Sequence, residues 1–122
     1  MAEEKTATTG MQQNVAGLLC YALGWLTGLV FYLMEKENKF VRFHAMQSII
    51  VFGGLSIIGG LLALFAMLLL LIPTVGPILY GLLLAFGSLL VTVLWILLMV
   101  KAYQNVRFKL PKIGDLAEKY SK

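Results

Sequence analysis

The residues most capable of chemistry lie between positions 40 and 48, which read Phe-Val-Arg-Phe-His-Ala-Met-Gln-Ser. This stretch holds the single His of the chain, His44, and one of its two Arg, Arg42. An imidazole can ligate a metal or haem and can transfer protons, while a guanidinium binds carboxylates and phosphates. His44 has no second His or Cys near it in the sequence, so hydrogen bonding at a membrane interface is the simpler interpretation.

The 40–48 stretch presents two faces if it is helical, because successive side chains are turned by about 100°. One face gathers aromatic and polar residues that suit lipid headgroups or a partner, namely Phe40, Phe43, His44 and Gln47. Arg42 points the other way, in line with Gly53, Ser56 and Gly60. It either turns toward neighbouring protein or extends to a lipid phosphate. Its acidic partners in the first case would be Glu35, Glu37, Asp115 or Glu118.

Catalytic motifs are not visible elsewhere in the chain. Paired carboxylates, a His cluster, a nucleophile elbow and a glycine-rich phosphate loop are all missing from the sequence. The stretches 15–34, 48–72 and 78–100 contain no Asp, Glu, Lys, Arg or His. Cys20 is the only Cys, and it lies in an apolar stretch where a thiol stays protonated. We therefore expect a non-enzymatic protein with no cofactor, catalytic residue or metal site.

The elements that carry these residues are predicted to cross a membrane. The 122 residues are 60% hydrophobic and 13% charged, whereas a soluble domain has about 25% charged residues. Apolar runs of about 20 residues are long enough to span a bilayer. We expect an all-α polytopic protein with three transmembrane helices, at about 15–34, 45–72 and 78–100. A flexible polar segment, 1–14, precedes them with Asn14 as helix cap, and a basic, interfacial tail follows at 101–122.

Small residues recur along each predicted span and favour close helix packing. Lipid supplies no hydrophobic drive between helices, so close backbone approach provides the contact instead. The residues concerned are Gly24, Gly28, Gly53, Ser56, Gly60, Gly81, Ala85 and Ser88. Whether they pack within one chain or between chains is left open by the sequence.

The distribution of charge predicts the orientation. Three spans place the 35–44 linker and the tail on one side, together with nine of the ten Lys and Arg. The positive-inside rule then predicts an outside N-terminus and a cytoplasmic C-terminus in a multi-pass cell-membrane protein. Because the net charge of +4 sits beside the spans, it indicates topology and not nucleic-acid binding.

Four stretches resemble a family of small prokaryotic membrane proteins of uncharacterised function. They are Asn14-Val-Ala-Gly-Leu-Leu-Cys-Tyr, Gly24-Trp-Leu-Thr-Gly-Leu-Val-Phe, the run from Glu35 through Phe-Val-Arg-Phe-His-Ala to Ser48, and Lys109-Leu-Pro-Lys-Ile-Gly-Asp-Leu-Ala-Glu. That family is similar in turn to the Tic-twenty-like group, named for a chloroplast protein-import component. The resemblance implies a compact multi-span helical protein and transfers no catalytic residues. The chloroplast proteins carry four spans, against three predicted here.

The function expected from these observations is a non-enzymatic subunit or scaffold of a membrane complex. Protein translocation or membrane-protein biogenesis is its most specific version, implied by the resemblance. The alternative is a small homo-oligomeric channel or carrier, and a third interpretation is an interfacial haem or metal protein that uses His44. The expected partners are the lipid bilayer and either further copies of the chain or other membrane proteins.

Overall fold

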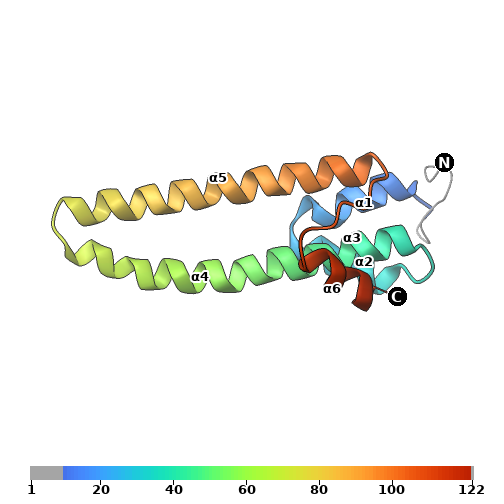
Figure 1. Cartoon of the computed structure of the whole chain (residues 1–122), viewed down its shortest axis with the longest axis horizontal. Coiled ribbons are helices and arrows are strands. Elements are labelled where there is room, and N and C mark those ends of the chain that lie inside the picture. The colour runs from blue at the N-terminus through green and yellow to red at the C-terminus, as the bar shows by residue number, and fades with distance from the viewer. Residues whose placement is uncertain (1–9, 122) are drawn as a thin grey trace.

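The computed structural model describes residues 10–121, and these residues form helices joined by short connections (Figure 1). The helices are α1 (Gln13–Ala22), α2 (Trp25–Met34), α3 (Lys39–Ser48), the π-helical η2 (Ile49–Gly53), α4 (Gly54–Ala66), the 3₁₀-helical η3 (Met67–Leu71), α5 (Val75–Tyr103) and α6 (Ile113–Tyr120). The all-α prediction is confirmed for the described residues.

A long helical hairpin dominates the shape of the molecule. Helices α3, η2, α4 and η3 follow one another as a 33-residue helix, Lys39–Leu71, and α5 runs back antiparallel to it over 29 residues. Pro73 ends the first arm, and Thr74 turns the chain with a positive φ of 69°. At 1.5 Å per residue the two helices measure about 50 and 44 Å, more than the roughly 30 Å of a hydrocarbon core. Both are therefore long and apolar enough to cross a membrane.

The expected first span, 15–34, is not one helix. It divides into α1 and α2, each of 10 residues, and each is only about 15 Å long. The chain reverses at Gly24, whose φ of 68° and ψ of −137° suit glycine alone. The structure thus has two candidate spans where three were expected. A hydropathy window misses this break because the residues on both sides of it are mostly apolar and none of residues 15–34 is charged.

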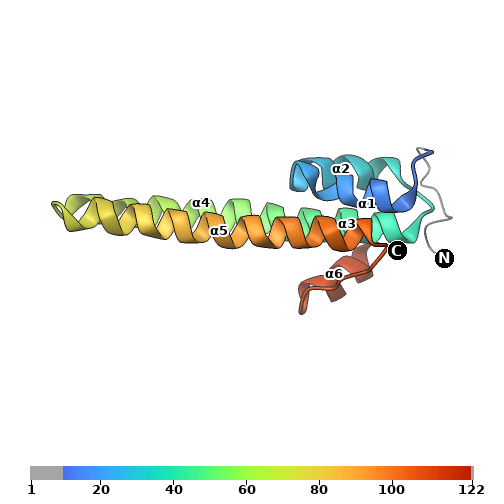
Figure 2. The same cartoon turned by 90° about the horizontal axis from the view of Figure 1, so that it is seen from above.

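The packed core lies at one end of the hairpin. There α1 and α2 cover one side of the helices α3 and α5, and α6 covers the other side (Figure 2). The buried apolar side chains belong to this end, among them Cys20, Tyr21, Phe43, Val41 and Leu98. We call this end the base (α1, α2, the 35–38 loop, α3, η2, α6, residues 94–103 of α5 and the 104–112 segment). Residues 54–71 and 75–93 are the arms.

Both ends of the described chain lie at the base (Figure 1). The Gln13 side-chain amide donates to Asn105 Oδ1 at 3.0 Å, and Asn38 donates to Gln13 Oε1 at 3.1 Å. The start of α1, the 35–38 loop and the end of α5 therefore lie together. The expected orientation, with an outside N-terminus and a cytoplasmic C-terminus, stays a prediction.

Helix boundaries differ from expectation by a few residues elsewhere. The second predicted span begins at Lys39 and ends at Leu71, and the third extends from Val75 to Tyr103. Asn14 lies inside α1, which Gln12 precedes. The tail contains the helix α6.

The small residues that were predicted to pack helices together differ in how closely other parts of the chain approach them. A Cβ on Gly28 would lie 2.9 Å from Ala45 O and from Ser48, so α2 approaches α3 closely there. A Cβ on Gly53 would lie 3.8 Å from Trp25. Gly60 and Gly81, in contrast, have no described atom within 4 Å of that position. Among these four glycines, close contact within the chain is thus confined to the end of the hairpin where α2 packs.

Candidate functional site

Three polar side chains meet in the centre of the base. Tyr21 comes from α1, and His44 and Gln47 come from α3, where a spacing of three residues puts them on one face. All three are fully buried. The Tyr21 hydroxyl lies 2.7 Å from His44 Nδ1 and 3.0 Å from Gln47 Nε2. A polar cluster at this depth is stable only if each group finds a partner.

The proton positions on His44 follow from its contact with a backbone carbonyl. His44 Nε2 lies 3.0 Å from Val106 O, and because a carbonyl oxygen only accepts, Nε2 carries the proton. His44 Nδ1 is then the acceptor of the Tyr21 hydroxyl proton. Neither ring nitrogen is free to ligate a metal, so the haem or metal interpretation of His44 is not supported by this arrangement.

The cluster also holds the segment that follows α5. Gln47 Nε2 donates to Phe108 O at 2.9 Å, and Gln47 Oε1 accepts from the Leu110 amide at 3.2 Å. Together with the His44–Val106 contact, these bonds satisfy three backbone groups of an extended segment. The buried cluster therefore clamps residues 106–110 onto α3.

Arg42 joins the ends of two helices. Its Nη1 donates to Tyr32 O at 3.1 Å and to Glu35 O at 2.6 Å, which lie at the end of α2. Its Nε donates to Ser121 O at 2.9 Å, just after α6. Carbonyls at helix C-termini lack partners within the helix, and a cation there also suits the helix dipole.

The aromatic face predicted from the sequence is brought together but faces inward. Phe40, Phe43, His44 and Gln47 are at most 7% exposed, and the rings of Phe40 and Phe43 pack edge-to-face on His44. Helix α1 and the 104–112 segment cover them, so in this structure they do not meet headgroups or a partner. Arg42 lies on the opposite side, as predicted, against carbonyl groups of the chain itself.

Sequence reasoning did not find Tyr21 or the covering segment. A hydroxyl in the middle of an apolar stretch needs an internal partner, and this is the signal that could have linked Tyr21 to the polar residues of α3. No comparable signal marks residues 106–110, because they contribute backbone groups.

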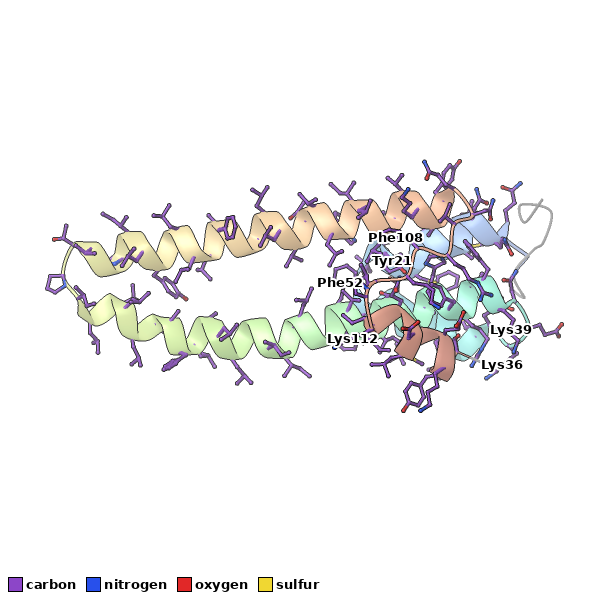
Figure 3. All side chains as sticks on the ribbon, in the orientation of Figure 1. Tyr21, Lys36, Lys39, Phe52, Phe108 and Lys112 are labelled. Atoms are coloured by element: carbon purple, nitrogen blue, oxygen red, sulfur yellow. The ribbon has the colours of Figure 1, made fainter. Side chains whose placement is uncertain are left out.

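The outer surface of the base is charged on the α6 side. Lys109 Nζ lies 3.1 Å from Asp115 and 3.2 Å from Glu118, and Arg107 lies 3.9 Å from Glu118. The hydrogen bonds that Lys109 donates to Asp115 and then to Glu118 raise the pKa of Lys109 above its ordinary value. Figure 3 shows Lys36, Lys39 and Lys112 at the base, in contrast to the uncharged arms.

A shallow apolar cavity of about 320 Å³ lies between α1 and α5. Leu18, Trp95, Met99 and Tyr103 line it, and it brings no acid–base pair together. Among residues 10–121, no group of three or more His, Cys, Asp or Glu is placed to hold a metal ion.

Comparisons with known proteins place this architecture among membrane proteins. A family model described as the magnetosome magnetite crystal formation protein family matches residues 3–117. A UPF0132 membrane protein of Methanocaldococcus jannaschii is 49% identical over 92% of this chain and 91% of its own length. Another from Archaeoglobus fulgidus is 47% identical over 88% of this chain and 94% of its own length. No solved structure matches.

Proposed function

This chain belongs to the prokaryotic membrane-protein family described as the magnetosome magnetite crystal formation protein family, and we propose that it acts as a non-enzymatic subunit or scaffold of a membrane complex. The observation that carries the proposal is the clamped tail. His44 and Gln47 direct their hydrogen bonds to the backbone of residues 106–110. A buried polar network in which every group has a hydrogen-bond partner gives a rigid structure. In this protein the rigid base carries the charged surface, and the apolar arms anchor it.

The charge distribution supports a cytoplasmic base. Residues 43–100 contain no Lys, Arg, Asp or Glu, so every charge of the described chain lies at the base. Juxtamembrane Lys and Arg are retained on the cytoplasmic side during insertion. We propose two crossings, with the base and both described chain ends in the cytoplasm and the turn at residues 72–74 on the outside.

The most specific version of this role is protein translocation or membrane-protein biogenesis. It rests on the resemblance to the Tic-twenty-like group, and a charged cytoplasmic surface beside two spans suits contact with other membrane proteins. The family description names magnetite crystal formation, which is a property of the proteins it was named for. The residues described here offer no clustered metal ligands, so iron binding is not part of this proposal.

A mild-detergent pull-down followed by mass spectrometry tests the scaffold role. The full chain should retain the same few membrane proteins in repeated preparations. A variant with Lys112→Ser and Lys119→Ser, which changes the exposed side of α6, should lose them. The matched control, Leu62→Ala and Leu82→Ala in the arms, should retain them. Purification of the chain without any stoichiometric partner would contradict the proposal.

A homo-oligomeric channel or carrier is the alternative, and one observation favours it. Gly59, Gly60, Gly81 and Gly87 of the arms have open space around them, which helices of further copies would fill. The hydroxyls of Ser56 and Thr92 donate to carbonyls of their own helices at 2.7 and 2.8 Å, so they line no polar path in one chain. Ion flux through liposomes containing only this protein would support the channel over the scaffold.

A further inference from the structure

The break between α1 and α2 leaves backbone carbonyl and amide groups without helical partners, and side chains of the protein form hydrogen bonds with them. Trp95 Nε1 donates to Tyr21 O at 2.5 Å, and Ser48 Oγ donates to Gly24 O at 2.9 Å. Thr27 Oγ1 donates to Cys20 O at 3.3 Å and accepts from the Leu23 amide at 3.1 Å. A turn facing water needs none of these bonds, because water supplies them. A turn at hydrocarbon depth requires them.

The side chains at the same turn are apolar and exposed. Leu23, at the tip, is 70% exposed, and the outward face of α2 continues with Leu26, Val30 and Leu33 at 49–58%. These positions follow the spacing of one helix face, and the whole stretch 15–34 contains no charged residue. An uninterrupted apolar face on a surface helix indicates a nonaqueous neighbour.

The length of each of the helices α1 and α2 matches half the thickness of the hydrocarbon core of a bilayer. Each has 10 residues, which gives about 15 Å, or half of a hydrocarbon core of roughly 30 Å. Their turn points along the hairpin toward the arms, since Gly24 faces Phe52 and Trp25 lies beside Gly53. Both helices begin or end at the charged side, where Gln13 contacts Asn38.

We propose that α1 and α2 form a re-entrant hairpin, which enters the membrane from the charged side, turns at Gly24 within that leaflet and leaves on the same side. The acyl chains of that leaflet cover the outward face of α2. This inference goes beyond the scaffold role and depends only on the protein being in a membrane. Its failure would leave the scaffold role untouched, although a crossing by residues 15–34 would overturn the proposed topology of two crossings.

The opposite side of the base meets a different environment at the same depth. Helix α6 lies across α3 from α2 (Figure 2), and its start at Lys112 reaches the level of Phe52 (Figure 3). The ion pairs of Lys109 with Asp115 and Glu118 are exposed there. Headgroups and water therefore reach deeper into the leaflet beside α6 than beside α2, which makes the protein an asymmetric wedge in that leaflet.

Spin labels on single cysteines measure both depths. The background is Cys20→Ala, reconstituted in vesicles of phosphatidylcholine and phosphatidylglycerol. The single cysteines are Leu23→Cys at the turn between α1 and α2, Leu33→Cys near the end of α2, and Leu116→Cys on α6. All three side chains are at least 45% exposed, so labelling disturbs little packing. Far-UV circular dichroism of each variant verifies that it remains helical.

The proposal predicts a several-fold higher ratio of oxygen to nickel-complex collisions for the label at Leu23 than for the label at Leu116, with Leu33 between them. Equal nickel access at Leu23 and Leu116 would put α2 in water and overturn the proposal. An immobilised label at Leu23 that neither reagent reaches would also overturn it, since another protein or a second copy would then cover the face.

Sidedness separates the re-entrant hairpin from a single crossing, which would also bury Leu23. In sealed vesicles, an impermeable maleimide should modify Met11→Cys and Lys36→Cys from the same side. Modification from opposite sides would mean that residues 15–34 cross the membrane, and the proposal would fall.

Discussion

The base and the arms of this protein are both helical yet are stabilised differently. In the base, Tyr21, His44, Gln47 and Arg42 form hydrogen bonds between segments far apart in the chain. In the arms, α4 contains no buried residue, and α5 buries only Gly76 at the turn and Leu98 and Ala102 within the base. The base is a specific packed structure, whereas the arms require only an apolar surrounding. Substitutions should therefore be costly in the base and nearly neutral in the arms.

The largest expected effect is that of His44→Ala. The change leaves a cavity and removes the partners of Tyr21 and Val106, which should lower the free energy of unfolding by about 3–5 kcal/mol. Thermal unfolding in detergent, followed by far-UV circular dichroism, measures it. The control is Leu62→Ala in α4, a 65% exposed position, where we expect a change below about 0.5 kcal/mol. Equal effects at the two sites would remove the distinction between base and arms.

Arg42→Gln should have the next largest effect. It removes charge-assisted bonds to the carbonyls of Tyr32, Glu35 and Ser121, for a loss of about 2–3 kcal/mol. Hydrogen exchange should show α6 and the end of α2 opening together. Lys39→Gln, at an exposed position of the same helix, is the charge-matched control. An unchanged exchange rate in α6 would mean that Arg42 does not hold the tail.

Gly24→Ala tests the break within the base. The φ and ψ of Gly24 lie in a region that alanine reaches only at a cost of about 1–3 kcal/mol. Loss of thermal stability should accompany a shift of Trp95 fluorescence, because the indole bonds to Tyr21 O beside the turn. Gly60→Ala, in an open part of α4, should change neither property.

Gly81→Leu tests whether the arms pack against further copies of the chain. No described atom lies near this position, so in a monomer the change in stability should be below about 0.5 kcal/mol. Size-exclusion chromatography with light scattering in mild detergent should show an unchanged mass. A loss of mass in the variant would reveal that the arms pack between chains, and would support the oligomeric channel.

The smallest effect is expected for Lys109→Met. Its ion pairs with Asp115 and Glu118 are exposed and screened, so only slightly faster hydrogen exchange in α6 should result. The pKa of Lys109 is raised above its ordinary 10.5. Its contribution is therefore fully present below pH 10.5 and lost only as the pH rises further. The difference from wild type should be constant at pH 6–9 and should shrink at about 1 M salt, where the Debye length is about 3 Å.

Particular residues show which helices and turns can be predicted from the order of apolar, charged and helix-breaking residues. The reversal near Pro73 and both long helices follow from uncharged apolar runs separated by a breaker cluster. The grouping of Phe40, Phe43, His44 and Gln47 follows from helical spacing. Gly24 was expected to pack against a helix and instead permits a reversal, because a glycine in an apolar run is compatible with either role.

The sequence by itself determined that this protein is helical and lives in a membrane. The physical reason is that residues 43–100 offer no charge and two apolar runs longer than a bilayer core. Only the tertiary structure decided that 15–34 turns back and that the tail covers the polar face of α3. Those outcomes depend on hydrogen bonds such as Trp95 to Tyr21 O and Gln47 to Phe108 O, which join residues more than sixty positions apart. No local pattern encodes a partner at that distance.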